Sequence, residues 1–149
     1  MEPANRNPAA RVPITITLVF IPDDRVYLNY VKKNGAKASV KSEYADRWIE
    51  AATAKMLSYV VITIQAKGRV PNHEASIAKL FNTELSQRIA RTAMKTLGTA
   101  ALITDPEHAP MKGRVPASYM ATVSSTIAGG TSEVQRNIVA TRGLGLPRA

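Results

Sequence analysis

The sequence predicts a mainly α protein, an antiparallel helical bundle preceded by a short β hairpin. Two observations predict the helices. Apolar residues recur every three or four positions over 45–63 and 77–97, and a helix-stopping glycine or proline follows each run. A third observation predicts the hairpin, because apolar residues alternate at every second position over 14–30. The 149 residues suffice for one domain that buries a core without disulfides.

The N-terminal part is predicted to be a lead-in, a hairpin and a linker. Residues 1–13 are rich in proline, asparagine and alanine and predict an extended lead-in. Residues 14–21 are β-branched and alternating, which is typical of a strand. A turn signal begins at Pro22 and residues 25–31 repeat the alternation, so we expect a hairpin that packs on another element. The polar, lysine-rich residues 32–41 predict a basic linker.

The first helix is predicted to begin at Ser42, a suitable N-cap with acidic residues in the turn behind it. Gly68 suits the left-handed position after a helix and Pro71 lies just beyond, so we expect the helix to end there. We therefore assign residues 1–41 to the lead-in, hairpin and linker, and residues 42–149 to a helical domain. The apolar stripe expected to face the core consists of Ala45, Trp48, Ile49, Ala52, Met56, Tyr59, Val60 and Thr63.

A second helix is predicted from the N-cap Asn72 to Gly98. The link from Gly68 to Asn72 is short, so the two helices should be antiparallel neighbours. Residues 99–115 have no sustained period and predict a loop, and Pro116 suits the first position of a third helix. The second helix is expected to bury Ile77, Ala78, Phe81, Leu85, Ile89, Ala93 and Leu97. Its outer face is expected to carry Lys79, Arg88, Arg91 and Lys95.

The double glycine Gly129–Gly130 ends the third helix and opens directly onto a last one, capped by Thr131 or Ser132 and running to about Thr141. Glycine lets a ligand or another backbone approach closely. The free N–H groups at a helix start suit an anion or a polarised oxygen. The pattern is compatible with such a site, but spacing alone favours a plain corner between two helices, with Thr131 as the cap.

Composition and spacing exclude several function classes. With no cysteine, the chain has no disulfide, thiolate metal ligand or cysteine nucleophile. We expect His73 and His108 to be a first-turn and a loop residue rather than metal ligands, and no Ser-His-Asp, Walker or Rossmann pattern is present. No apolar run approaches the roughly 18 residues of a membrane span, and the N-terminus lacks the order of a signal peptide, so we expect a cytoplasmic protein.

The stretch 126–148 (Thr-Ile-Ala-Gly-Gly-Thr-Ser-Glu-Val-Gln-Arg-Asn-Ile-Val-Ala-Thr-Arg-Gly-Leu-Gly-Leu-Pro-Arg) resembles the C-terminal end of acyl-CoA dehydrogenases almost residue for residue. Ala75-Ser-Ile-Ala-Lys-Leu-Phe and Glu84-Leu-Ser-Gln-Arg-Ile-Ala resemble the preceding helix of that family. Members are oligomeric FAD enzymes that oxidise the Cα–Cβ bond of an acyl-CoA thioester. A carboxylate removes the α proton and the flavin accepts the β hydride. The resemblance implies that this chain holds mainly the C-terminal four-helix domain.

By position, the resemblance implies that Gly130 lies near the substrate thioester. The residues implied near the flavin phosphates or ribose are Thr131, Ser132 and Glu133. In the stretch Lys95-Thr-Leu-Gly-Thr, the residues implied to contact the FAD of a neighbouring subunit are Lys95, Gly98 and Thr99. Many members have the catalytic Glu where this chain has Gly129, which cannot abstract a proton, so no catalytic residue is assigned. The carboxylates expected to point outward or lie in a first turn, not to act as a base, are Glu43, Glu50 and Glu74.

Three hypotheses follow. The first is an FAD-dependent acyl-CoA dehydrogenase that is incomplete as a lone chain, because base, flavin and substrate need a closed, dry site. The second is a non-catalytic helical subunit that forms a homo- or hetero-oligomer. The third starts from the net charge of +9, which implies an anionic partner. A nucleic acid bound along residues 79–95 is the weakest of the three, because no helix-turn-helix spacing or aromatic platform supports it.

Overall fold

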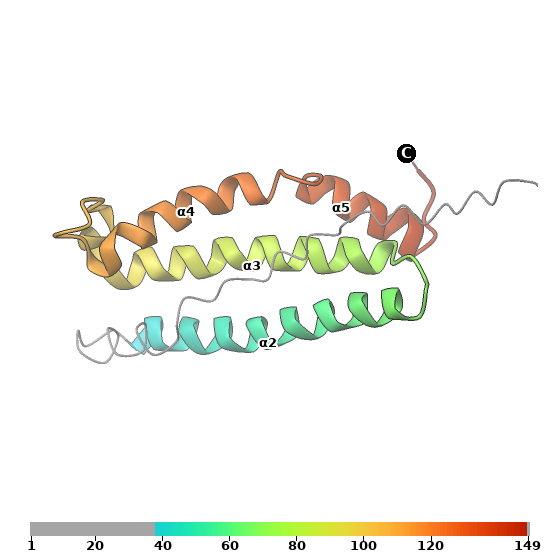
Figure 1. The fold of residues 1–149 in the computed structure, drawn as a ribbon, viewed down its shortest axis with the longest axis horizontal. Helices are drawn as coiled ribbons and strands as arrows, with labels where there is room; N and C mark the ends of the chain where they lie inside the picture. Colours follow the sequence, from blue (N-terminus) through green and yellow to red (C-terminus); the bar gives the residue numbers. More distant parts are fainter. Residues whose placement is uncertain (1–37, 149) are drawn as a thin grey trace, which may run out of the picture.

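The computed structural model describes residues 38–148, and these are mainly helical, as predicted. Its α-helices are α2 (Ala38–Ala66), α3 (His73–Leu97), α4 (Arg114–Ser125) and α5 (Ser132–Ile138). Short turns follow α3 and precede α4, namely η1 (Gly98–Leu102) and η2 (Pro110–Gly113), and α5 continues as the π-helical turn η3 (Val139–Gly143). In Figure 1, α3 runs between α2 on one side and α4 with α5 on the other. The predicted hairpin at 14–31 lies outside the described residues.

The start of α2 corrects the sequence prediction, and its end confirms it. The helix begins at Ala38, four residues before the predicted cap, so Ser42 lies inside it and residues 38–41 are not linker. Burial of Val40 gives this extra turn an apolar contact that the lysine-rich composition obscured. At the other end, Gly68 has a φ of +71° and donates its N–H to the Gln65 carbonyl (2.9 Å), which is the predicted glycine stop.

The α2 and α3 helices are antiparallel neighbours, as predicted. Two ion pairs fix their register: Glu43 pairs with Lys95, and Glu50 pairs with Arg88 at 3.1 Å. The pairs step forward along α2 and backward along α3. Between the helices, a core cluster joins Ala51, Ala54 and the fully buried Leu85, with Phe81 and Ile89 packed against it. The two alanines have small side chains, which lets the α3 leucine lie directly against α2.

The predicted stripe of α2 faces away from the core, which is a correction. Trp48, Ile49 and Met56 are 53%, 65% and 57% exposed. The α2 residues that are buried instead are Val40, Ala51, Ala54, Ser58 and Val61. Both faces of α2 are apolar, so periodicity alone could not decide between them. The small residues of the inner face permit a closer approach of α3 than tryptophan and isoleucine would.

The α3 stripe predicted from sequence is buried or half-buried as expected, and α3 also buries polar residues because it has neighbours on both sides. Their hydroxyl groups bond within the helix: Thr83 donates to the Lys79 carbonyl (2.9 Å) and Thr92 to the Arg88 carbonyl (3.0 Å). Such bonds one turn back satisfy a buried hydroxyl without a partner helix. The helix ends at Gly98, as predicted.

The segment between α3 and α4 forms a second core cluster, of Ala93, Leu97, Ala101 and Val115. Gly113, with a φ of +71°, ends this segment where an added Cβ would lie 2.6 Å from the Thr104 carbonyl oxygen. The α4 helix begins directly after this glycine. Pro116 is therefore its third residue rather than its first, a place where no intrahelical N–H bond is needed. Within residues 38–148, no helix combines the length and apolar character that crossing a membrane requires.

Candidate functional site

The Gly129–Gly130 turn joins α4 to α5 through backbone conformations that favour glycine, with φ of +69° and +101°. An added Cβ on Gly130 would lie 2.7 Å from the Gln135 side-chain nitrogen, whereas one on Gly129 would meet nothing within 4 Å. Gly130 is thus closely surrounded, and Gly129 faces open space. Gly129, the position at which the resemblance implies a base in many family members, is therefore sterically free but holds no acid.

Two buried or half-buried side chains hold this turn in place. Lys79 of α3 donates from Nζ to the carbonyl oxygens of Gly130 (2.5 Å) and Thr126 (3.2 Å). Gln135 of α5, which is buried, donates from Nε2 to the Gly129 carbonyl (2.9 Å). Desolvation lowers the pKa of Lys79 below 10.5, and the nearby Glu84 charge opposes that shift. The prediction that Lys79 lies on an outer face is wrong. Its hydrogen-bond partners, Thr126 and Gly130, lie 47 and 51 positions further along the chain, so no local sequence pattern indicates this role.

Thr131 caps α5, as predicted, by accepting the Val134 N–H at 3.4 Å. Glu133 lies in the first turn, and its carboxylate accepts its own N–H and the Thr131 hydroxyl. These hydrogen bonds, in that order of size, lower the pKa of Glu133 below 4.5. The helix start therefore already has an anion of its own. A phosphate here would meet negative charge, whereas a hydroxyl group could donate to the carboxylate.

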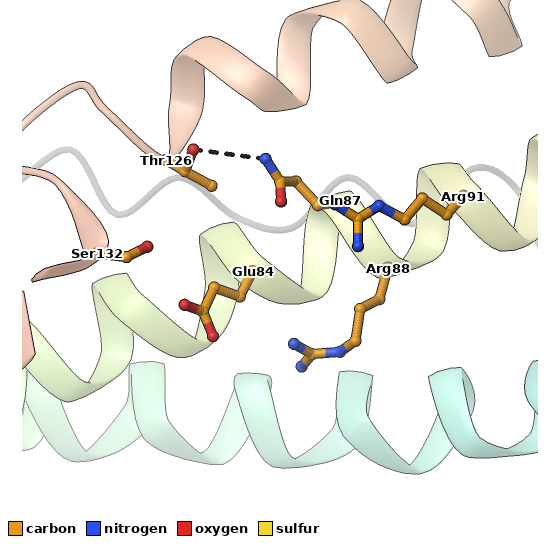
Figure 2. Close-up of a pocket in the computed structure, with 6 residues that line it drawn as sticks. All are labelled: Glu84, Gln87, Arg88, Arg91, Thr126 and Ser132. Atoms are coloured by element: carbon orange, nitrogen blue, oxygen red, sulfur yellow. Dashed lines mark hydrogen bonds between the residues drawn. The ribbon is translucent and has the colours of Figure 1, made fainter.

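A shallow pocket of about 250 Å³ lies beside this turn, between α3 and the α4–α5 connection. Figure 2 shows its lining: Glu84, Gln87, Arg88, Arg91, Thr126 and Ser132. Gln87 points toward Thr126 (3.4 Å between Nε2 and Oγ1), and Arg88 points toward α2, where Glu50 neutralises it. Glu84 pairs with Arg136 at 2.5 Å. Among the described residues, Arg91 has no carboxylate partner, so it gives the pocket its available positive charge.

The structure separates the two groups of residues that the family resemblance implies for FAD. Ser132 and Glu133 adjoin the Lys79-held turn, whereas Lys95, Gly98 and Thr99 lie at the other end of α3. Sixteen helical residues separate Lys79 from Lys95, a rise of about 24 Å. Glu43 of α2 pairs with Lys95. One bound pyrophosphate therefore cannot contact both groups within a single chain.

The other carboxylates and histidines lie away from the turn or in partnerships of their own. Glu74 accepts the Asn72 N–H (3.0 Å), and its pKa is lowered by its own backbone N–H and then by that of Asn72. His108 hydrogen-bonds to Asp105, three residues earlier, a pair that the sequence interpretation overlooked. Across residues 38–148, no cluster of three or more potential metal ligands occurs.

The three-layer arrangement and the glycine turn can now be compared with known proteins. The sequence model described as "Acyl-CoA dehydrogenase, C-terminal domain" matches residues 27–144. The chain belongs to the acyl-CoA dehydrogenase family. The family match includes the Gly129–Gly130 turn, both arms of the α2–α3 hairpin and the loop before α4.

Individual members of the acyl-CoA dehydrogenase family match shorter parts. Acyl-CoA dehydrogenase FadE26 of Mycobacterium tuberculosis is 46% identical over 77 residues, covering 51% of this chain and 19% of that protein. Acyl-CoA dehydrogenase IpdE1 of the same organism is 30% identical over 93 residues, covering 62% and 23%. The chain thus spans about a fifth of the length of these relatives.

Solved structures of the family have the same fold. The Tcur3481-Tcur3483 steroid ACAD superposes with a TM-score of 0.77 at 24% identity, over 85% of this chain and 33% of that one. The ChsE4-ChsE5 complex from Mycobacterium tuberculosis superposes with a TM-score of 0.68 at 35% identity, over 76% and 29%. Both matches therefore cover about a third of the neighbour's chain.

Proposed function

We propose that this chain supplies the helical wall of an FAD-dependent acyl-CoA dehydrogenase site that is completed by other protein. The observation that carries the proposal is the Gly129–Gly130 turn, which Lys79 and Gln135 hold open beside the start of α5. In this role Gly130 borders the acyl-CoA thioester, where its lack of a side chain permits a close approach. When bound, FAD supplies the acceptor for the hydride that leaves the β carbon.

The residues near the turn fit the hydroxyl-bearing part of FAD better than its phosphates. The Glu133 carboxylate can accept a ribose hydroxyl, as acidic residues do in other dinucleotide sites. Its charge disfavours a phosphate at the same place. Arg91, across the pocket from Ser132, is the better phosphate partner because no described carboxylate neutralises it. Lys95, Gly98 and Thr99 are assigned to the FAD of a neighbouring subunit, because they lie too far along α3 to share this one.

In this proposal the described residues 38–148 bind and orient, and none of them is assigned as the base. Gly129 has no side chain, and the ion-paired Glu43 and Glu50 lie on α2, across α3 from α4 and α5. Glu84, which lines the pocket, is paired with Arg136. In this proposal a carboxylate from another chain or domain removes the α proton. Two of the solved relatives, the Tcur3481-Tcur3483 protein and a variant of it at 25% identity, are described as steroid ACADs. Steroid-derived acyl-CoA esters are accordingly the first substrate class to test.

A second candidate is a non-catalytic partner subunit. Gly129 favours this candidate, because the turn forms with a glycine where a dehydrogenase would need its catalytic acid. The solved relative ChsE4-ChsE5 is a complex, which is the type of assembly that such a subunit would join. A basic nucleic-acid-binding face is disfavoured: Lys79 hydrogen-bonds to carbonyls, and carboxylates neutralise Arg88 and Lys95.

The deciding measurement is the visible spectrum of the purified full chain after incubation with FAD and desalting. The dehydrogenase proposal predicts retained flavin absorbance without oxidation of added acyl-CoA. Arg91→Met should weaken flavin retention, whereas Arg114→Met, a matched change at an exposed arginine of α4, should not. A colourless protein would contradict retention of FAD by this chain alone and support the partner-subunit candidate.

A Gly129→Glu variant tests whether other protein is needed to complete the site. The added side chain has space, but a φ of +69° strains any L residue by about 1 kcal/mol. We expect no acyl-CoA dehydrogenation by this variant as a lone chain, because these residues supply only one wall of the proposed site. Activity of the lone variant, measured with an artificial electron acceptor, would contradict the view that other protein completes the site.

A further inference from the structure

One end of the bundle joins the connection between α2 and α3 to the segment that follows α5. Figure 1 shows both segments at the same end of the molecule. Arg142 donates from Nη1 to the Asn72 side-chain oxygen (2.9 Å), and an added Cβ on Gly143 would lie 3.2 Å from the His73 ring. Segments 70 residues apart in the chain therefore form one surface. We call residues 67–74 and 142–148 the end surface.

The end surface is strongly basic. Its exposed cations, which form no ion pair among residues 38–148, are Lys67, Arg69, Arg142 and Arg148. One carboxylate, Glu74, lies beside them, and backbone N–H groups already hold it. At the opposite end of the bundle, Lys112 and Arg114 are balanced by Asp105 and Glu107. Charge therefore distinguishes the two ends.

Three aliphatic side chains protrude from the same surface. Val70, Leu144 and Leu146 are 87%, 71% and 53% exposed. The Leu144 N–H donates to the Val139 carbonyl (3.1 Å) and the Leu146 N–H to the Ala140 carbonyl (3.0 Å), so the backbone holds both leucines in place. Aliphatic side chains that protrude among unpaired cations are typical of a surface that contacts an anionic bilayer.

We propose that the end surface binds an anionic phospholipid bilayer. Val70, Leu144 and Leu146 enter the boundary between headgroups and acyl chains, and the cations contact the lipid phosphates. Lysine and arginine suit this place because their apolar stems lie along aliphatic groups while their charged ends stay in water.

The exposure of the aliphatic side chains favours a bilayer over a folded acidic protein. A bilayer accepts protruding side chains without a matching groove, whereas a protein partner needs a complementary surface. The end surface lies beyond α5 and η3 from the Gly129–Gly130 turn. The bilayer proposal therefore does not depend on the proposed flavin site.

Sedimentation of the full chain with vesicles tests the role of charge. We expect binding to phosphatidylcholine vesicles that contain phosphatidylserine, and none to pure phosphatidylcholine. Arg69→Gln should weaken binding about fivefold, the factor that one cation near an anionic bilayer contributes. Arg114→Gln is the matched control, because it removes the same charge from an exposed arginine at the opposite end. Equal weakening by the two variants would show attraction to the charge of the whole chain and would overturn the proposal.

An aliphatic variant tests insertion. Leu144→Asp should weaken binding to phosphatidylserine vesicles by more than about tenfold, because it removes buried apolar surface and adds a repelled charge. Leu102→Asp, at a residue that is also 71% exposed but lies at the opposite end, should have a much smaller effect. If Leu144→Asp bound as well as Leu102→Asp while Arg69→Gln bound weakly, the contact would be with charge alone. That result would overturn the bilayer proposal and favour an acidic protein as the partner.

A fluorescent label reports which end of the bundle enters the bilayer. The chain has no cysteine, so Leu146→Cys can carry a single polarity-sensitive fluorophore. Its emission should shift to the blue when phosphatidylserine vesicles are added, because the label leaves water. The same label on Leu102→Cys should show no shift. A shift at both positions, or at neither, would overturn the proposed orientation.

Discussion

Replacing Lys79 with methionine tests whether the glycine turn is held from α3. The substitution keeps the length of the side chain and removes the ammonium that donates to the Gly130 and Thr126 carbonyls. A hydrogen bond to a charged group contributes about 1.5–3 kcal/mol. The lowered pKa of Lys79 shows that desolvation of the ammonium offsets part of that gain. We therefore expect the free energy of unfolding to fall by about 2 kcal/mol for the two bonds together.

Urea unfolding followed by circular dichroism measures this loss, and hydrogen exchange locates it. The Gly130 N–H, which donates to the Ile127 carbonyl at 3.2 Å, should lose protection in Lys79→Met. Lys112→Met is the matched control: Lys112 is exposed and forms no ion pair among the described residues. Equal stability of the Lys79→Met and Lys112→Met variants, with unchanged exchange at Gly130, would refute the reasoning.

The same variant carries a pH signature. In the folded chain the pKa of Lys79 lies below its ordinary value of 10.5. At any pH between the folded pKa and 10.5, the unfolded chain therefore binds more protons than the folded one. Stability of the wild type therefore rises with pH across that window. Lys79→Met lacks this rise. The difference in unfolding free energy between wild type and variant should accordingly grow toward pH 10.5, and a constant difference would contradict the partly desolvated ammonium.

Two further predictions concern the core and the start of α5. Leu85→Ala should lower the unfolding free energy by about 3 kcal/mol, because Leu85 is fully buried, whereas Leu102→Ala, at a 71% exposed residue, should cost less than about 0.5. In an NMR titration Glu133 should titrate below 4.5, and Thr131→Val should raise that midpoint. The stability from Glu133 is complete above pH 4.5 and is lost as pH falls through its lowered pKa.

The sequence predicted α3 well and the orientation of α2 poorly, for one physical reason. Leu85 and Leu97 belong to one apolar stripe on α3, and it is buried. In α2 the large apolar residues form one face and small residues such as Ala51 and Ala54 form the opposite one. Periodicity selects the larger residues, but close helix packing in this chain selects the smaller. Only the position of α3 distinguishes the core face of α2 from the exposed one.

The sequence predicted those features of the candidate site that depend on residues close together in the chain. The Gly129–Gly130 turn and the Thr131 cap follow from residues next to one another, and the structure has both. The contact from Lys79 joins segments 51 residues apart, so it depends on the packing of α5 against α3. The resemblance implies Glu133 near the flavin phosphates or ribose, and the hydrogen bonds that its carboxylate accepts account for its place at the helix start.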